Sequence, residues 1–346
     1  MLTNPEDRDP YIQFSRRLVR ILKETKPPVS ALTKTDSIPA TGFNDNKSKS
    51  LKRPDYVPIT PAEVEGMRVA HQVMVREMSN LTLPFKQGSR GIVSTAGGAH
   101  LPIFILFLRA DEARGDNYLC QELLPSLNAR CVILDDFFPS GLVKLEKYQY
   151  KIFSVLFSSF GEVLLLDADN FPVHNVDHVF KTEPFTTTGL VTWPDFWISS
   201  ASEKFYKIQG KPVPSTNVRA STESGQVLVN KQTHSTALLV STYYNFYGPS
   251  HYYPLLTQGG PVSEPVKILG YDDNGELRGV AMLQSNPVDD YIALVKPLPF
   301  TIHANFPKMD PNTLFNQDGP AINHRTEHII KVFGVDDDSI YDPSAT

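Results

Sequence analysis

The sequence of 346 residues predicts an α/β fold with a mostly parallel central sheet flanked by helices. Two observations predict it. Apolar and β-branched runs typical of buried strands alternate with helical patterns through the middle of the chain, and one of these runs ends in two closely spaced acids. Hydrophobic residues make up 41% of the chain, which is enough for a substantial core. The formal net charge of −5 gives no positive field for a phosphate backbone, so we expect no nucleic-acid partner.

Residues 1–59 are polar and interrupted by prolines, which predicts a stem or linker, partly disordered, with one short helix at Phe14–Leu22. The pattern changes at Thr60, a predicted N-cap, which is followed by Pro61 at the first helical position. The amphipathic helix that begins here carries apolar residues at Val64, Met67, Val69, Val73 and Val75. We therefore predict a main domain over residues 60–335 and a flexible tail over 336–346.

The next pattern is typical of an α/β unit that binds a nucleotide. A β-branched run at Ile92–Thr95 predicts a strand, and an apolar helix is expected from Leu101. Between them, Gly97 and Gly98 predict a turn that lets backbone N–H groups approach a ligand. A second strand is predicted at Ala129–Asp136. Further elements are a helix over residues 142–160 and a final strand over 300–306.

Between these lies the stretch FGEVLLLDADNFPVHNVDHVF, residues 160–180, whose apolar run Val163–Leu166 leads directly into Asp167 and Asp169. Two carboxylates at about 4–6 Å repel each other, and a hard divalent cation, Mn²⁺ or Mg²⁺, relieves the repulsion and can also hold a diphosphate. In α/β sheets, ligands bind beyond the carboxyl ends of strands. The alternative is that the two acids merely cap the next turn.

Two later residues are weaker candidates for the same chemistry. His303, near the end of the chain, could complete a metal site, or it could be an ordinary core or surface histidine. Lys151 could reach a phosphate, or it could lie on the solvent face of its helix. The residue types alone leave both alternatives open.

Two polar segments are candidates for binding a sugar. Glu223, Ser224, Gly225 and Gln226 come directly before a β-branched strand, where Gly225 permits a tight turn and its neighbours can hydrogen-bond hydroxyl groups; the alternative is an ordinary loop. Trp193 and Trp197 flank Asp195, a combination suited to stacking on a sugar and binding its hydroxyls. Aromatic clusters more often belong to a core, which we expect for Trp197.

The two cysteines, Cys120 and Cys131, are too few to reveal the redox compartment, and a disulfide between them stays open. The sequons Asn46-Lys-Ser and Asn80-Leu-Thr would be glycosylated if the chain entered the secretory pathway. No apolar run approaches the ~20 residues that a membrane-spanning helix needs. We therefore expect no transmembrane segment within these residues.

Six segments in the same order resemble the fungal Golgi α-mannosyltransferases of glycosyltransferase family 71, the mannan-branching enzymes. They are KYQYKIF, EVLLLDADNFPVHNVDHVF, GLVTWPDFW, ESGQVLVN, YYNFYGPSHYYPLLTQG and IHANFPKM, within about residues 90–311. The resemblance implies a GT-A fold, GDP-mannose as donor, a manganese-type ion, and transfer with retention of configuration to a terminal mannose of a glycan. It also implies a type II membrane protein of the Golgi lumen. The stretch around Tyr247–Tyr253 is closer to the α-1,2-transferring branch.

Carried over by position, the resemblance implies that Asp167 and Asp169 hold the metal and the diphosphate and that His303 is a metal or phosphate contact. Lys151 would contact the donor. The sugar site would be lined by Glu223, Ser224, Gly225 and Gln226. The residue pattern, independently of the resemblance, adds Gly97 and Gly98 for the nucleotide and Trp193 for the sugar. We assign no nucleophile; the catalytic candidates are Glu223 and Asp195.

The chain also differs from the family pattern. Compared with the family pattern, the segment after IFILFLR looks shortened, and LLTQGGP is followed by VSEPVKILGY instead of an acidic segment and a helix. The membrane anchor that the family implies is not found among these residues. One alternative is therefore a family member with an impaired active site. A more remote alternative is a glycoside hydrolase with two facing carboxylates, which would need neither metal nor nucleotide.

Overall fold

The computed structural model describes residues 5–36, 51–53, 55–95, 105–108, 119–138, 145, 149–168, 170–172, 175–217, 220–256, 280–285 and 299–306. The chain divides into two compact units. The first comprises Met1–Gly97, Ile103–Leu165 and Thr188–Val262, and the second comprises Gly98–Pro102, Leu166–Thr187 and Ser263–Thr346. The structure is α/β, as the sequence predicts.

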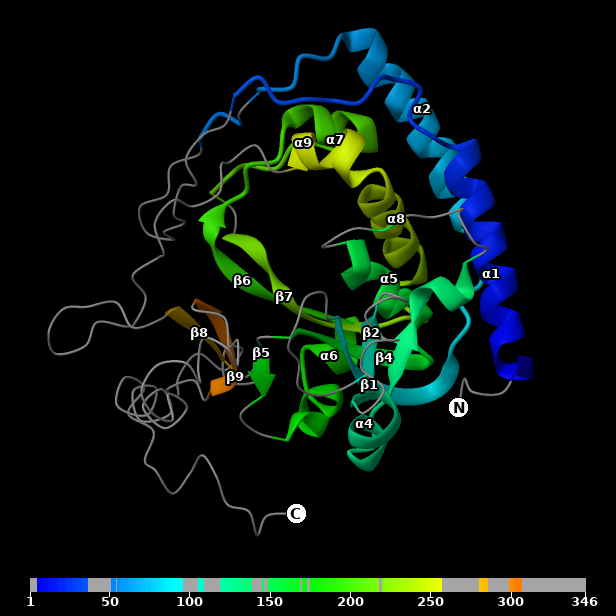
Figure 1. Cartoon of the computed structure of the whole chain (residues 1–346). Coiled ribbons are helices and arrows are strands. Elements are labelled where there is room, and N and C mark those ends of the chain that lie inside the picture. The colour runs from blue at the N-terminus through cyan, green and yellow to red at the C-terminus, as the bar shows by residue number, and fades with distance from the viewer. Residues whose placement is uncertain are drawn as a thin grey trace, which may run out of the picture. The chain divides into compact units, whose positions relative to one another are not determined.

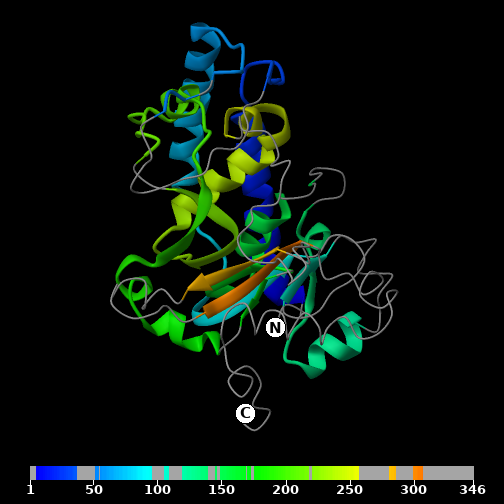
Figure 2. The same cartoon turned by 90° about the vertical axis from the view of Figure 1, so that its left-hand side faces the viewer.

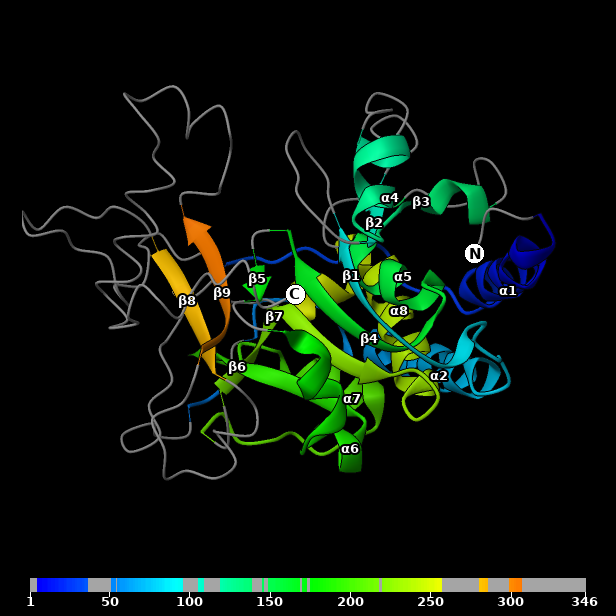
Figure 3. The same cartoon turned by 90° about the horizontal axis from the view of Figure 1, so that it is seen from below.

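The first unit is built on a six-stranded sheet with strand order β3-β2-β1-β4-β7-β6 (Figure 3). Its strands are β1 (Lys86–Thr95), β2 (Ile105–Leu108), β3 (Cys131–Ile133), β4 (Phe160–Asp167), β6 (Leu190–Ile198) and β7 (Ala220–Asn230). The pairs β1–β2 and β2–β3 are parallel, whereas β6–β7 is antiparallel. The sheet is therefore mixed.

Strand β4 lies in the middle of this sheet. Its residues Val163, Leu164, Leu165 and Leu166 are all buried, so side chains on both faces of the strand are covered. This explains why the apolar run is continuous instead of alternating with polar residues. The strand predicted at Val163–Leu166 is confirmed, and it ends at Asp167.

Helices pack against the sheet and share one core with it (Figure 1). They are α1 (Pro5–Glu24), α2 (Pro61–Met78), α5 (Gln149–Phe157), α7 (Glu203–Gln209), α8 (Ser235–Phe246) and α9 (Tyr253–Leu256), with a π-helical turn η4 (Gly248–Tyr252) between α8 and α9. Helix α7 is capped by Gly210, whose φ of 67° lies in the left-handed region that glycine adopts without strain. The predicted flanking of the sheet by helices is confirmed.

The start of α2 follows from local chemistry. Thr60 Oγ1 accepts a hydrogen bond from the Glu63 backbone N–H, and the Glu63 carboxylate accepts one from the Thr60 N–H, which completes a capping box. The predicted N-cap and the position of Pro61 are confirmed. The buried stripe differs from the predicted one, because it consists of Met67, His71, Met74 and Met78, while Val69 is 49% exposed.

The N-terminal segment contributes to the core. Tyr11, Phe14, Leu18 and Leu22 on α1 are buried, and so are three residues of the connection to α2, Leu32, Val57 and Ile59. The hydroxyl groups of Tyr243 and Tyr247 donate to the carbonyls of Thr25 and Leu22, both at 2.7 Å. Composition predicted a stem here, whereas these buried apolar side chains belong to the core of the first unit. The predicted boundaries at residues 60 and 335 stay predictions.

The connections between strands differ from the sequence prediction in three places. Ile105–Leu108, expected within a helix from Leu101, forms strand β2, because a short apolar run fits a buried strand as well as a buried helix. The strand predicted at Ala129–Asp136 shortens to β3 and continues as a 3₁₀ turn, η2 (Leu134–Phe137). The helix predicted over 142–160 is described as α5, which ends at Phe157, before β4 begins at Phe160.

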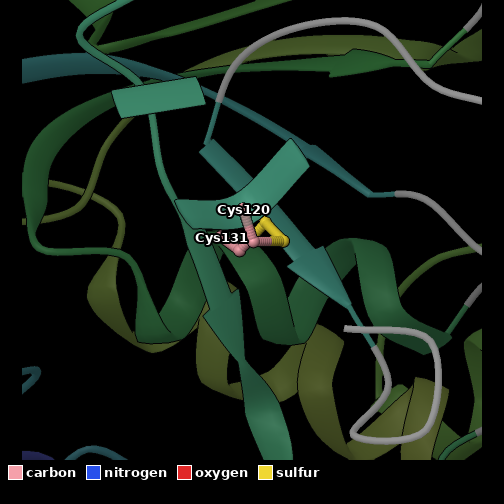
Figure 4. The surroundings of a disulfide bond; sticks show 2 residues. All are labelled: Cys120 and Cys131. Carbon is pink, nitrogen blue, oxygen red and sulfur yellow. A yellow bond between two sulfur atoms is a disulfide. The ribbon is translucent and has the colours of Figure 1, made fainter. Parts of the chain in front are cut away.

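A disulfide joins Cys120 to Cys131 (Figure 4). Cys120 lies in a π-helical turn, η1 (Leu119–Leu123), which is followed by the short helix α4 (Leu124–Ser126), and Cys131 begins β3. Their Cα atoms are 5.3 Å apart, within the usual range for this bond. Both cysteines of the chain are thereby paired.

The second unit contains a three-stranded antiparallel sheet with strand order β5-β9-β8. Its strands are β5 (Asn170–Pro172), β8 (Val280–Ser285) and β9 (Pro299–Phe306), and the last two are the golden and the orange arrows that lie side by side in Figure 2. A 3₁₀ turn, η3 (Val176–Lys181), and the start of α6 (Phe185–Thr188) also belong to it. The predicted final strand is confirmed as β9. Within the described ranges, no helix has the length and apolar character that crossing a membrane requires.

Candidate functional site

The acidic motif lies where β4 passes into β5, in the second unit. Asp167 is the last residue of β4 and is half-buried, Asp169 lies outside the described residues, and Asn170 begins β5 and is buried. In the antiparallel pairing of β5 with β9, Asn170 lies directly opposite His303. The Cα atoms of such pairs are about 4.5–5.5 Å apart. The strand register therefore brings the backbone of His303 next to the residue that follows Asp169.

This register gives a structural reason for grouping the three predicted metal ligands. The structure describes only the backbone of His303, in β9, and Asp169 lies outside the described residues. The ligand set of Asp167, Asp169 and His303 therefore stays a prediction. Among the side chains that are described, no three of His, Cys, Asp or Glu come together. Two carboxylates and one imidazole nonetheless match the donors that Mn²⁺ accepts.

A wide irregularity in the β6–β7 pairing defines a second candidate region, in the first unit. Thr192 pairs with Val227 and Pro194 pairs with Thr222, so the segment Glu223–Gln226 lies opposite the single residue Trp193. The predicted polar segment is thus a bulge inside β7 and does not precede the strand. Bulges of this kind are common next to active sites, where they redirect side chains.

A second irregularity follows directly. Pro194 pairs with Thr222 and Ile198 with Ala220, so three residues of β6, including Asp195 and Trp197, lie opposite Ser221. We call the two irregularities together the β6–β7 bulge, residues 193–197 and 221–226. It contains both catalytic candidates, Asp195 and Glu223. The register of two strands brings them into one region although they are 28 positions apart in the numbering.

The side chains of this bulge differ in exposure. Glu223 is 7% exposed and Gln226 is fully buried, whereas Ser224 is exposed. The Glu223 Oε1 atom accepts a hydrogen bond from the Gly225 backbone N–H at 2.6 Å, which fixes the carboxylate against its own strand. Trp193 is buried and Trp197 is half-buried, the reverse of the exposure expected from the sequence. The side chain of Asp195 is not among those described.

Helix α5 contacts the bulge through Lys151. Its Nζ atom donates to the Ser224 carbonyl at 3.2 Å, so Lys151 lies at the bulge and not on an unrelated solvent face. The ammonium group is partly exposed and places a positive charge beside the polar segment. This grouping of Lys151 with Ser224 was not part of the sequence prediction.

A second lysine joins the same two elements at their other ends. Lys231, directly after β7, is fully buried, and its Nζ atom donates to the carbonyls of Leu156 and Ser158 at 3.0 and 2.8 Å, where α5 ends. Burial lowers the pKa of Lys231 to about 7. The two lysines therefore connect β7 to α5 at two places, one near the start of the helix and one at its end. Nothing in the sequence marks Lys231, because a lysine after a strand is usually exposed.

The predicted glycine turn follows β1. The strand ends at Thr95, and Gly97 and Gly98 lie outside the described residues, so their role stays a prediction. Ser94, the penultimate residue of β1, is buried, and its Oγ atom has no hydrogen-bond partner among the described residues. The carboxyl end of β1 therefore combines a buried hydroxyl with the predicted glycine turn.

The chain is similar to known proteins over the region that contains most of these features. A family model described as a mannosyltransferase matches residues 93–220 and 212–264. The α-1,2-mannosyltransferase MNN2 of Saccharomyces cerevisiae is 28% identical over 309 residues, covering 67% of this chain and 51% of that protein. The α-1,2-mannosyltransferase MNN24 of Candida albicans is 32% identical over 260 residues, covering 59% of this chain and 36% of that protein.

A further relative is the α-1,2-mannosyltransferase MNN5 of Saccharomyces cerevisiae, 30% identical over 269 residues, which cover 56% of this chain and 46% of that protein. The chain spans about half the length of the curated relatives it matches. The family match includes α5, the acidic motif and the whole β6–β7 bulge. The chain therefore belongs to the fungal family of mannosyltransferases that its motifs resemble.

Proposed function

We propose that the chain is a retaining α-mannosyltransferase that transfers mannose from GDP-mannose to a terminal mannose of a glycan, in an α-1,2 linkage, during outer-chain or mannan synthesis. The observation that carries this proposal is that the mannosyltransferase family model matches residues that include both the acidic motif and the β6–β7 bulge, while curated relatives are named α-1,2-mannosyltransferases. The α/β architecture, with acids at the end of β4, supports a GT-A fold.

The acidic motif is the proposed metal site. Asp167, Asp169 and His303 would hold Mn²⁺ or Mg²⁺, and the opposition of Asn170 to His303 in the β5–β9 register supports this set. A bound divalent cation would neutralise the charge that develops on the diphosphate as the bond between mannose and GDP breaks, without any proton transfer. Gly97 and Gly98 would bring backbone N–H groups to the nucleotide.

The β6–β7 bulge is the proposed sugar site. Ser224, which is exposed, would bind a hydroxyl group directly. Gly225, Gln226 and Trp193 are buried, so we propose that they shape the wall of the sugar site. Lys151, whose ammonium group already contacts the bulge at Ser224, would add a positive charge for the donor phosphates. Glu223, held as an acceptor by the Gly225 N–H, and Asp195 are the carboxylates that would assist the reacting sugar.

We further propose that the protein acts in the secretory pathway, as a type II membrane protein of the Golgi lumen. The Cys120–Cys131 disulfide supports a compartment that permits oxidation of thiols, because such bonds are rare in reducing compartments. The proposed partners are GDP-mannose and a mannose-terminated glycan. No nucleic-acid partner is proposed, in line with the net charge of −5.

The test is mannose transfer to a mannose-terminated acceptor, measured together with the release of GDP, in Mn²⁺ and again after chelation. Wild-type protein is expected to require the metal, and Asp169→Asn is expected to abolish turnover and weaken donor binding while thermal stability stays near that of wild type. Undiminished transfer by Asp169→Asn would refute the metal assignment. Absence of transfer at high enzyme concentration would favour an impaired family member. Hydrolysis of a mannoside that persists in chelator would favour a glycosidase.

A further inference from the structure

The connection between α2 and β1 carries the sequon Asn80-Leu81-Thr82 on the surface of the first unit. Asn80 and Thr82 are exposed, whereas Leu81 between them is buried and anchors the segment. Ser79, the C-cap of α2, and Arg76, in its last turn, are exposed as well, and the Arg76 side chain is 70% exposed. The asparagine therefore lies on a polar surface with space for a large hydrophilic substituent.

From this geometry we propose that Asn80 is an N-glycosylation site of the protein. The inference rests on the proposed secretory location and goes beyond the proposed transferase activity. The ligand class is an oligosaccharide carried on a polyprenyl diphosphate. The Asn80 Nδ2 atom forms a bond to the anomeric carbon, the bond from that carbon to the diphosphate breaks, the polyprenyl diphosphate leaves with the electron pair, and one amide proton passes to a base.

The folded chain tolerates this modification. The Nδ2 atom of Asn80 donates one hydrogen bond, to the Arg76 carbonyl at the end of α2, at 3.1 Å. The contact is exposed, so water can replace it on either side, and a substituted amide keeps one N–H. The backbone turn is held independently, by Leu81 N–H to the Met78 carbonyl at 3.0 Å. Attachment of a glycan therefore leaves the fold of this connection intact.

The position of Asn80 also separates the glycan from the proposed nucleotide turn. Asn80 precedes the amino end of β1 at Lys86, and Gly97 and Gly98 follow its carboxyl end at Thr95. Ten residues of strand, at about 3.3 Å each, span about 30 Å. A glycan at Asn80 is thus attached before the amino end of β1, whereas the predicted nucleotide turn follows its carboxyl end.

The disulfide supports the compartment independently of the sequon. Cys120 and Cys131 are paired, and oligosaccharide transfer to asparagine takes place on proteins that enter the same oxidising pathway. The two observations come from separate parts of the first unit. A reducing compartment would be expected to leave the asparagine unmodified and the thiols free.

The experiment uses the protein produced from its own gene in its native host, with an affinity tag. The peptide that contains Asn80 is analysed by mass spectrometry before and after an amidase that removes N-linked glycans in heavy-oxygen water. We expect most copies to carry a glycan and to show the isotopic label at Asn80 after release. The variants Asn80→Gln and Thr82→Ala should lose this signal, whereas Thr82→Ser and Asn46→Gln should keep it.

Two outcomes would overturn the proposal, and they are distinguishable from failure of the transferase assignment. An unmodified Asn80 in protein that carries the disulfide and transfers mannose would refute the glycosylation site alone. An unmodified Asn80 together with free Cys120 and Cys131 thiols would refute both the site and the secretory location. Because Thr82→Ser keeps the hydroxyl that the sequon needs, it controls for misfolding of the Thr82→Ala variant.

Discussion

Replacing Arg53 with methionine tests whether the N-terminal segment is part of the folded unit or a passive stem. Arg53 is 6% exposed, and its guanidinium donates four hydrogen bonds to three backbone carbonyls. One bond reaches Ser199 at 3.2 Å, one reaches Ala201 at 3.0 Å, and two reach Pro214 at 3.2 and 3.0 Å. Ser199 directly follows β6, and Pro214 lies shortly before β7. A single side chain therefore ties together the two chain ends of the β6–β7 bulge.

The magnitude follows from these contacts. Hydrogen bonds to a charged group contribute about 1.5–3 kcal/mol each, and three carbonyl groups would lose their donor. The guanidinium also lies 4.9 Å from the centre of the Tyr206 ring, a cation–π contact worth about 0.5–2 kcal/mol. Methionine keeps the packing of the aliphatic stem, and water reaches part of the vacated carbonyls. We therefore expect a loss of about 3–4 kcal/mol in the free energy of unfolding.

The assay is urea unfolding followed by tryptophan fluorescence, because both tryptophans of the chain, Trp193 and Trp197, lie in β6 next to the Arg53 contacts. Arg76→Met is the matched control. Its side chain is 70% exposed and pairs with the neighbouring Glu77, so a change within about 0.5 kcal/mol is expected. If Arg53→Met unfolds like Arg76→Met, residues 51–53 do not support the bulge, and the reasoning fails.

Three further changes separate stability from activity. Burial lowers the pKa of His71 to about 4, so the unfolded state binds more protons than the folded state between pH 6.5 and 4, and the free energy of unfolding should fall by about 2–3 kcal/mol over that range. In equilibrium unfolding, the variant His71→Gln should lose this part of the pH dependence. Lys151→Met should lower the rate of mannose transfer by about 10- to 100-fold with little change in the unfolding free energy, whereas the exposed control Lys207→Met should change neither quantity. Equal transfer rates for the two variants would exclude a contact between Lys151 and the donor. Glu223→Gln keeps an acceptor for the Gly225 N–H, so its unfolding free energy should stay within about 1 kcal/mol of wild type while kcat falls. An unchanged kcat would show that Glu223 takes no part in the reaction.

Local signals in the sequence predicted several elements correctly. The N-cap at Thr60 depends on residues within one helical turn, so it can be recognised without knowledge of the rest of the fold. The strand ending at Asp167 was recognisable because a fully buried strand needs a continuous apolar run. The segment Ile105–Leu108 has the same kind of run, and there the pattern alone could not distinguish strand from helix.

Contacts between distant segments were not predictable from one sequence. The β6–β7 bulge exists because of a pairing register, and the segment Glu223–Gln226 shows only polar residues and a glycine before β-branched ones. The opposition of His303 to Asn170 and the contact of Lys151 with Ser224 likewise depend on how strands and helices meet. The burial of α1 was missed because composition measures the average polarity of a segment and not the side that packs.

The central claim is that the acids after β4 bind a cation that holds the diphosphate of a GDP-linked sugar. It is tested most directly by determining the crystal structure of the protein with Mn²⁺ and GDP. We predict anomalous manganese density coordinated by Asp167, Asp169 and His303 and by the diphosphate oxygens. The claim would be contradicted if that position held no metal while both carboxylates formed turn caps or ion pairs.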